Sequence, residues 1–124
     1  MPHSFGAYLI LYIMVDLFHY TRRASSVAHI GAIDLGGDNP IRIQSMTTTN
    51  TNDTEACVRQ AEENIKAGGE LVRFTTQGSR EAENMKNINA GIRADGYQTP
   101  LVAAVHFNPN VAAVAALSCE TVRV

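Results

Sequence analysis

The chain has 124 residues, of which 45% are hydrophobic and 18% charged, and its formal net charge at pH 7 is −2. This length suits one ordinary domain, and the composition is that of a folded protein rather than a disordered one. A net charge this small gives no attraction to nucleic acid or to an anionic membrane, so we expect neither as a partner.

The N-terminal residues contain a short apolar run, Ala7–Val15. It is shorter than the roughly 20 residues that a membrane span needs, and no basic segment precedes it as in a signal peptide. Met14 then begins a stretch that is typical of a natural protein start. We therefore predict that residues 1–14 are an extension outside the fold and that residues 15–124 form the folded part.

The next segment predicts a small β-hairpin. Apolar residues alternate from Val27 to Ile33, and turn-forming residues follow in Gly36–Pro40. We expect this hairpin to lead directly into the first strand of a larger sheet.

Three apolar strand candidates follow at a constant spacing of thirty residues, Ile41–Met46, Leu71–Thr76 and Leu101–Phe107. A fourth candidate begins at Glu120. The segments between them have the periodicity of helices. Strands and helices that alternate in this way predict parallel βα units with right-handed crossovers.

The first intervening helix is expected to begin at Asn52 or Asp53 and to end at Gly68–Gly69. Its predicted apolar stripe contains Cys57, Ala61 and Ile65. Glu62 is expected in solvent. The second helix has a predicted apolar face made of Ala82, Met85, Ile88 and Ile92. Its solvent face is predicted to contain Glu81, Lys86 and Arg93.

The third helix is predicted to begin with Asn108 as its N-cap and Pro109 at its first position, where the missing N–H costs nothing. Its buried side is expected to contain Val111, Val114 and Leu117.

Two architectures use such repeats, an open doubly wound sheet and a closed (β/α)8 barrel. The loop after the first strand candidate has neither GxGxxG nor GxxxxGK[ST], which favours the barrel. A complete barrel needs eight strands and about 250 residues. We therefore predict an α/β fold, a partial TIM barrel with the first three βα units and the start of strand four, preceded by the hairpin.

In such a barrel, the functional residues lie at the carboxyl ends of the strands. The polar residues expected there are Gln44, Ser45, Arg73, His106 and Arg123. A guanidinium within an apolar strand needs a partner, so each arginine either pairs with a carboxylate or faces an anionic ligand such as phosphate. His106 either faces the ligand or bonds to a neighbouring strand end. The spacing of the histidines and cysteines predicts no metal site.

Three segments resemble one known family, the bacterial 4-hydroxy-3-methylbut-2-enyl diphosphate synthases of the methylerythritol phosphate route to isoprenoids. They are Pro40–Gln60, Gly68–Asn89 and Thr99–Ala112. The stretch from Val15 to Gly37 is similar to the start of the longer variant of this family, so the resemblance covers nearly the whole chain.

The resemblance implies an iron–sulfur oxidoreductase, in which an N-terminal TIM barrel precedes a domain that holds a [4Fe-4S] cluster through three cysteines and a glutamate. It implies reductive ring opening and dehydroxylation of 2-C-methyl-D-erythritol 2,4-cyclodiphosphate, with electrons from ferredoxin or flavodoxin. It also implies a cytoplasmic homodimer. By motif, Arg73 and Arg123 are expected to bind the diphosphate, while Gln44, Ser45 and His106 match further residues of the substrate site.

Two departures from the family pattern weaken the expectation of activity in this chain. Ala104 replaces an aspartate in the third strand, and Ala113 replaces another. None of the cluster cysteines is present, because Cys57 and Cys119 fall on barrel helices or their ends. We therefore predict an inactive fragment that binds no cluster. The alternatives are a dihydropteroate-synthase-like pterin-binding barrel and a non-catalytic βα module that associates with itself through its open edges.

Overall fold

The computed structural model describes residues 18, 19, 21 and 23–124. The predicted extension, residues 1–14, lies outside the described residues. Within the described part of the chain, no helix has the length and apolarity that crossing a membrane requires.

The predicted hairpin is present and consists of β1 (Val27–Ile30) and β2 (Ile33–Gly36), which pair antiparallel. Its turn lies at residues 31 and 32, between the paired residues Ile30 and Ile33, and so precedes the glycine-rich segment. Gly31 has a φ of 58°, the left-handed conformation that a two-residue hairpin turn requires and that glycine adopts at little cost.

Four parallel strands form the second sheet in the order β3-β4-β5-β6. They are β3 (Gln44–Met46), β4 (Leu71–Thr76), β5 (Leu101–Val105) and β6 (Thr121–Arg123). Three helices connect them: α2 (Thr54–Lys66), α3 (Ser79–Ala94) and α4 (Pro109–Ala116). The three βα units and the start of a fourth strand confirm the predicted partial barrel.

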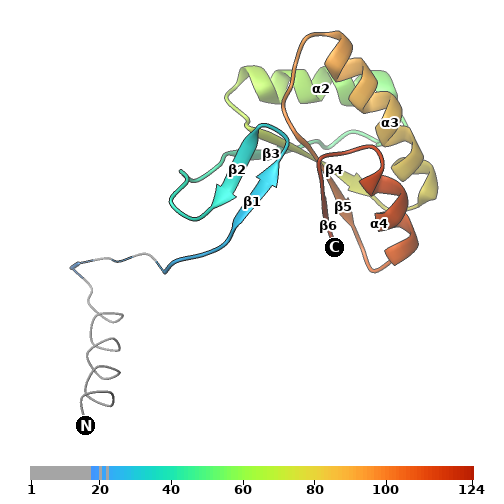
Figure 1. Cartoon of the computed structure of the whole chain (residues 1–124). Helices are drawn as coiled ribbons and strands as arrows, with labels where there is room; N and C mark the ends of the chain where they lie inside the picture. The colour runs from blue at the N-terminus through green and yellow to red at the C-terminus, as the bar shows by residue number, and fades with distance from the viewer. Residues whose placement is uncertain (1–17, 20, 22) are drawn as a thin grey trace.

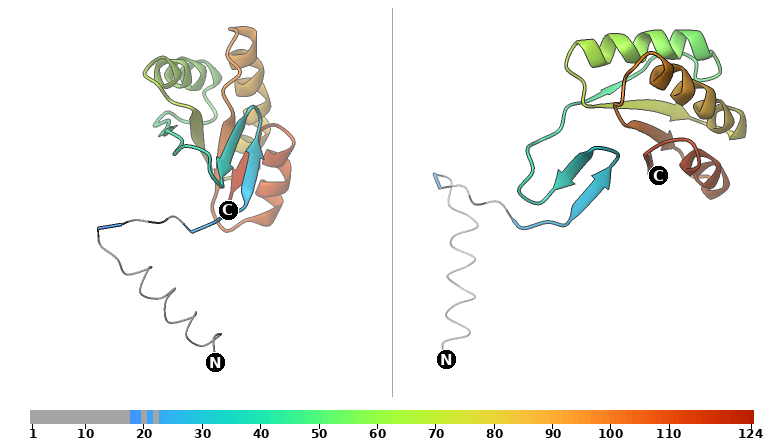
Figure 2. Two further views of the ribbon diagram at one scale, coloured as in Figure 1. Left: turned by 60° about the vertical axis from the view of Figure 1, so that its left-hand side comes forward. Right: turned by 45° about the horizontal axis from the view of Figure 1, so that its top comes forward.

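The three helices cover one face of this sheet, and the hairpin lies on the other side, as Figures 1 and 2 show. Val72 and Phe74 of β4 are buried against the apolar stripes of α2 and α3. Ala103 and Val105 of β5 are buried with Val111 of α4. The alternate residues of these strands therefore point away from the helices, into what would be the interior of a closed barrel.

The hairpin covers the amino-terminal part of this inner face. Ile30 of β1 is buried in one apolar cluster with Leu71 and Val102, which lie at the starts of β4 and β5. Nearer the carboxyl ends of the strands, the inward-facing residues Met46 and Arg123 are exposed. The hairpin thus closes the bottom of the partial barrel and leaves its mouth accessible.

The helix starts follow the sequence predictions closely. Asp53 is the N-cap of α2 and accepts a hydrogen bond from the Ala56 amide. Asn108 caps α4 and accepts from the Asn110 amide, with Pro109 at the first position. All four residues of the predicted apolar face of α3 are fully buried.

One predicted strand boundary and two predictions about side chains are wrong in this part of the fold. The first strand begins at Gln44 rather than Ile41: Ile41 is 88% exposed, and the Arg42 side chain bonds to the Asp34 carbonyl of the hairpin and to Glu70. Leu117 lies beyond the last helical residue of α4 and is exposed instead of buried. Arg93 is not free in solvent: its Nη2 donates to Glu120 Oε1 at 2.6 Å, and its Nη1 donates to two carbonyls.

Candidate functional site

The strand register determines which side chains face the interior of the partial barrel. Laterally paired residues in a sheet point to the same side, and residues two apart along a strand do so as well. Since Val72, Phe74 and Ala103 face the helices, the residues between them face inward. The inner positions are Gln44, Met46, Leu71, Arg73, Thr75, Val102, Ala104, Thr121 and Arg123.

Both predicted arginines belong to this inner set. Arg73 pairs with Met46 on one side and Val102 on the other, and Arg123 pairs with Ala104 one step nearer the mouth. Neither arginine forms an ion pair with any carboxylate in the described part of the chain. The sequence left two possibilities for each arginine, a carboxylate partner or an anionic ligand. Among the described residues, no carboxylate partner is seen for either.

Arg73 is half-buried, and its two lateral partners in the sheet, Met46 and Val102, are uncharged. Its Nη2 lies 3.1 Å from the Sδ of Met46, while its Nε is buried without a hydrogen-bond partner. A buried N–H without a partner costs free energy, more so when it belongs to a charged group. An anion bound at the inner face would supply the missing acceptor.

Ala104 and His106 follow along β5 toward the mouth. Ala104 is buried between Thr75 of β4 and Arg123 of β6. His106 comes one residue after the end of β5 and is exposed, and it continues the alternation of inward positions 102 and 104. Phe107, the next residue, has a φ of 58° and is almost fully exposed.

The other two predicted residues lie apart from this group. Gln44 faces inward, but it is the first residue of β3 and pairs with Leu71. It therefore lies nearer the amino-terminal end of the sheet than Arg73, which pairs with Met46. Ser45 pairs with Val72 and so points to the side that the helices cover. The structure therefore brings Arg73, Arg123 and the position of His106 to one end of one face, but not Gln44 or Ser45.

The loop between β3 and α2 is held in place by residues that the sequence did not single out. Gln60 on α2 accepts from the amides of Thr48 and Thr49 and donates to the Thr48 hydroxyl. Asn84 on α3 donates to the Thr51 carbonyl at 2.7 Å. The polar helix positions of Gln60 and Asn84 carry no pattern that distinguishes them from solvated residues.

This loop also reaches the end of β4 and lines a small polar pocket. The Thr51 hydroxyl donates to the Thr75 carbonyl at 2.6 Å. The pocket has a volume of about 250 Å³ and is lined by Thr49, Asn50, Thr51, Asn52, Thr75, Gln77 and Glu81. Its walls thus combine the loop with the carboxyl end of β4, the region where ligands bind in βα barrels.

The two cysteines are built into the fold. Burial raises the pKa of the Cys57 thiol, which donates to the Asn50 carbonyl and also contacts the Thr49 hydroxyl. Burial likewise raises the pKa of Cys119, which donates to the Ala115 carbonyl. A protonated thiol is a poor metal ligand. Among the described residues, no group of three or more potential ligands could hold a metal ion.

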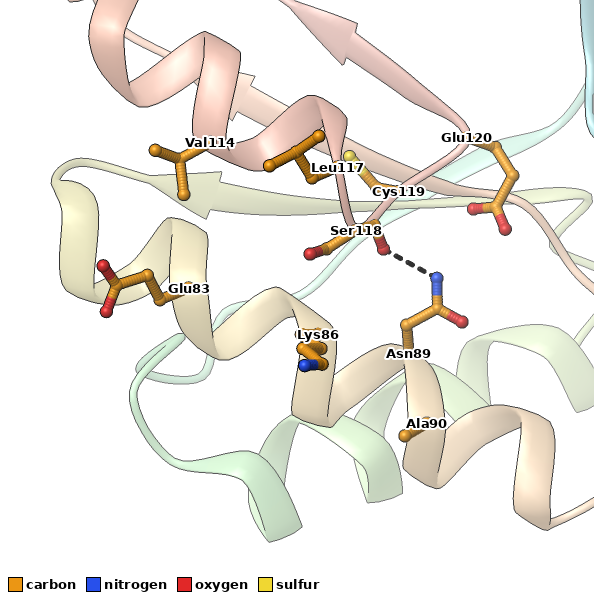
Figure 3. Close-up of a pocket in the computed structure, with 9 residues that line it drawn as sticks. All are labelled: Glu83, Lys86, Asn89, Ala90, Val114, Leu117, Ser118, Cys119 and Glu120. Carbon is orange, nitrogen blue, oxygen red and sulfur yellow. Dashed lines mark hydrogen bonds between the residues drawn. The ribbon is translucent and has the colours of Figure 1, made fainter.

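A further groove lies on the opposite side of the sheet, where the helices pack. It has a volume of about 730 Å³ and lies between α3, α4 and the segment that precedes β6 (Figure 3). Across it, Asn89 donates to the Ser118 carbonyl at 2.7 Å. None of the inward-facing arginines or His106 lines this groove. The candidate binding groups therefore lie at the mouth of the partial barrel and not in this groove.

Comparison with known proteins gives a consistent assignment. The family model described as the GcpE TIM-barrel domain matches residues 25–124. The chain is 68% identical over 110 residues to the 4-hydroxy-3-methylbut-2-en-1-yl diphosphate synthase (flavodoxin) of Phocaeicola vulgatus. It is 64% identical over 110 residues to the protein of the same name from Bacteroides thetaiotaomicron. Against the protein of that name from Chlorobaculum tepidum, identity is 42% over 108 residues.

These alignments cover most of this chain and little of the relatives. They include 89% of the chain for the first two and 87% for the third, but only 18%, 18% and 14% of the relatives themselves. The chain thus spans less than a fifth of the length of the curated relatives it matches. Its repeated βα units, its parallel sheet and the family match over residues 25–124 agree, and the chain belongs to the GcpE TIM-barrel family.

Proposed function

We propose that this chain supplies part of the diphosphate-binding mouth of a 4-hydroxy-3-methylbut-2-enyl diphosphate synthase. The full reaction opens the ring of 2-C-methyl-D-erythritol 2,4-cyclodiphosphate and removes a hydroxyl group as two electrons arrive from flavodoxin or ferredoxin. Residues 15–124 correspond to the first part of the barrel. The names of the relatives, which include flavodoxin, support this choice of reaction and donor.

One observation carries the proposal: two arginines face the inside of the partial barrel, and neither is paired with a carboxylate in the described chain. Arginine is well suited to a diphosphate because its planar guanidinium donates two parallel hydrogen bonds. We assign direct contact with the diphosphate to Arg73 and Arg123, and contact with the rest of the substrate to His106. Gln44 and Ser45 receive less support, because one lies nearer the amino-terminal end of the sheet and the other faces the helices.

The described residues do not fit an iron–sulfur cluster. Cys57 and Cys119 are both hydrogen-bonded to backbone carbonyls, and their thiols are protonated at neutral pH because burial raises the pKa of each. The chemistry of electron transfer would therefore come from another domain, and we assign none of it to this chain. We further propose a homodimeric complete enzyme in the cytoplasm, where free thiols such as these persist.

The test is the binding of inorganic diphosphate and of the cyclodiphosphate to this chain, measured by isothermal titration calorimetry. Arg73→Gln and Arg123→Gln are each expected to weaken binding by roughly tenfold or more, since a hydrogen bond to a charged group contributes about 1.5–3 kcal/mol. Arg59→Gln is the matched control, because Arg59 is exposed on α2. Unchanged affinity in the double variant Arg73→Gln, Arg123→Gln would contradict the proposal.

The two alternatives differ in their support. A pterin-binding barrel is favoured by no feature of the site, and the family match points elsewhere. A self-associating module is favoured by the sheet itself, since β3 and β6 each pair on one side only within the described residues.

A further inference from the structure

Among the described residues, Met46 provides the hydrogen-bond acceptor that the Arg73 guanidinium has. The two residues are lateral partners on β3 and β4, and both face inward. Nη2 of Arg73 lies 3.1 Å from Sδ of Met46. A thioether sulfur is a weak hydrogen-bond acceptor without charge. The contact can therefore orient the guanidinium without neutralising it.

The remaining inward positions around Arg73 provide no competing anion. The inner positions of the four strands contain two arginines and no aspartate or glutamate. On its other side, Arg73 has the apolar Val102 as its partner. The Nε of Arg73 is buried without an acceptor, so at least one donor is left available. A carboxylate at position 46 would satisfy this group permanently, and a purely aliphatic residue would leave Nη2 without a partner as well.

From this geometry, we propose that Met46 is a positioning residue that holds Arg73 in place for a diphosphate group and leaves its charge uncompensated. The inference rests on the proposed function, because it concerns how the same site binds its anion. Met46 itself is not assigned any contact with the ligand. Its side chain is 41% exposed, which means that substitutions at this position do not disturb the buried core.

Three substitutions separate orientation from packing, with inorganic diphosphate as the probe. Met46→Gln keeps a neutral acceptor and is expected to bind within about threefold of the unchanged chain. Met46→Leu removes the acceptor and is expected to weaken binding about three- to tenfold, the equivalent of one lost hydrogen bond. Met46→Glu places a carboxylate beside Arg73 and is expected to weaken binding more than about tenfold.

Met85→Leu is the matched control, because Met85 is buried on α3 on the helix side of the sheet. Its diphosphate affinity is expected to equal that of the unchanged chain. Equal affinities for the unchanged chain, Met46→Leu and Met46→Glu would overturn the inference even if diphosphate binding itself is present. Circular dichroism of each variant shows whether the fold is retained.

An independent measurement separates this inference from the proposed function. In a chain with ¹³C-labelled methionine methyl groups, Arg73→Gln is expected to shift the NMR signal of the Met46 methyl and to leave that of Met85 unchanged. If the unchanged chain binds no diphosphate, the proposed function fails. If the Met46 methyl signal is insensitive to Arg73→Gln, the contact is absent and the positioning role is overturned, whatever the binding data show.

Discussion

Ala104 occupies the position on the inner face where a carboxylate would have the greatest effect. It lies between Thr75 and Arg123 in the register and is 3% exposed. An aspartate is expected here from the resemblance of strand three to the synthase family. The side chain of that aspartate would lie beside Arg123, which could keep it ionised in a buried setting.

The expected outcome of Ala104→Asp, placed in a full-length synthase whose first barrel segment is this chain, is a sharp rise in turnover. A positioned acid or base contributes on the order of 10²-fold to a rate, and steady-state assays with a reduced flavodoxin would measure the change. Ala90→Asp is the control, because Ala90 is exposed on α3, on the helix side of the sheet. No change with Ala104→Asp would place position 104 outside the reacting site.

The sequence predicted the role of single residues well where the interaction that fixes them lies within a few residues along the chain. Asp53, Asn108 and Pro109 act within one helical turn, and all three are where the sequence predicted them. Arg93 could not be predicted in the same way, because its partner Glu120 is 27 residues away and becomes its neighbour only when β6 joins the sheet. The long arginine side chain then reaches a carboxylate that no periodicity reveals.

At the scale of elements, the contact between α2 and the end of α3 brings two acidic groups together. A hydrogen bond between the carboxyl groups of Glu62 and Asp95 raises the pKa of Glu62, and burial adds to this effect. Asp95 is the residue that ends α3. The expectation that Glu62 is a freely solvated surface residue is therefore wrong, since helix periodicity does not show which neighbouring helix end lies beside it.

This pair predicts a pH dependence of stability. The pKa of Glu62 is higher in the folded state, so protonated Glu62 stabilises the fold. This contribution to the free energy of unfolding is fully present below the ordinary glutamate pKa of about 4.3 and is lost as the pH rises through the raised value. Glu62→Gln is therefore expected to raise the free energy of unfolding at pH 7 by about 0.5 kcal/mol, the scale of surface charge pairs. Urea unfolding between pH 4 and pH 8 measures this.

The control for Glu62 is Glu63→Gln on the exposed side of the same helix, which is expected to leave the free energy of unfolding at pH 7 unchanged. A lower stability of Glu62→Gln at pH 7 would show that the ionised carboxylate is favourable.

Element boundaries show a similar limit of sequence reasoning. The apolar residues from Ile41 to Met46 suggested one strand, but composition does not show where pairing with the next strand begins, and only Gln44–Met46 are paired in the ladder.

For the whole molecule, the constant spacing of the strand candidates predicted parallel βα units, and the loop after the first candidate favoured a barrel over an open sheet. Each βα unit buries one helix face against one sheet face, so the sheet order follows the chain order. The spacing did not show that the hairpin covers only the bottom of the inner face, where Ile30 meets Leu71 and Val102. That contact depends on tertiary packing between segments about 40 and 70 residues apart, which the spacing of the strands does not reveal.

The open edges of the sheet predict that this chain associates with itself. An unpaired strand edge is a template for another chain, and apolar side chains flank both edges here: Ile43 before β3 is 58% exposed and Val124 after β6 is 82% exposed. We expect this chain to associate as its concentration rises from about 10 to 100 µM in sedimentation velocity. The double variant Ile43→Lys, Val124→Lys is expected to remain monomeric, because lysine at an edge opposes strand pairing. Leu117→Lys alters an equally exposed residue beyond α4 and is expected to associate as the unchanged chain does. Association that only Leu117→Lys abolishes would instead place the contact on the helix side of the sheet.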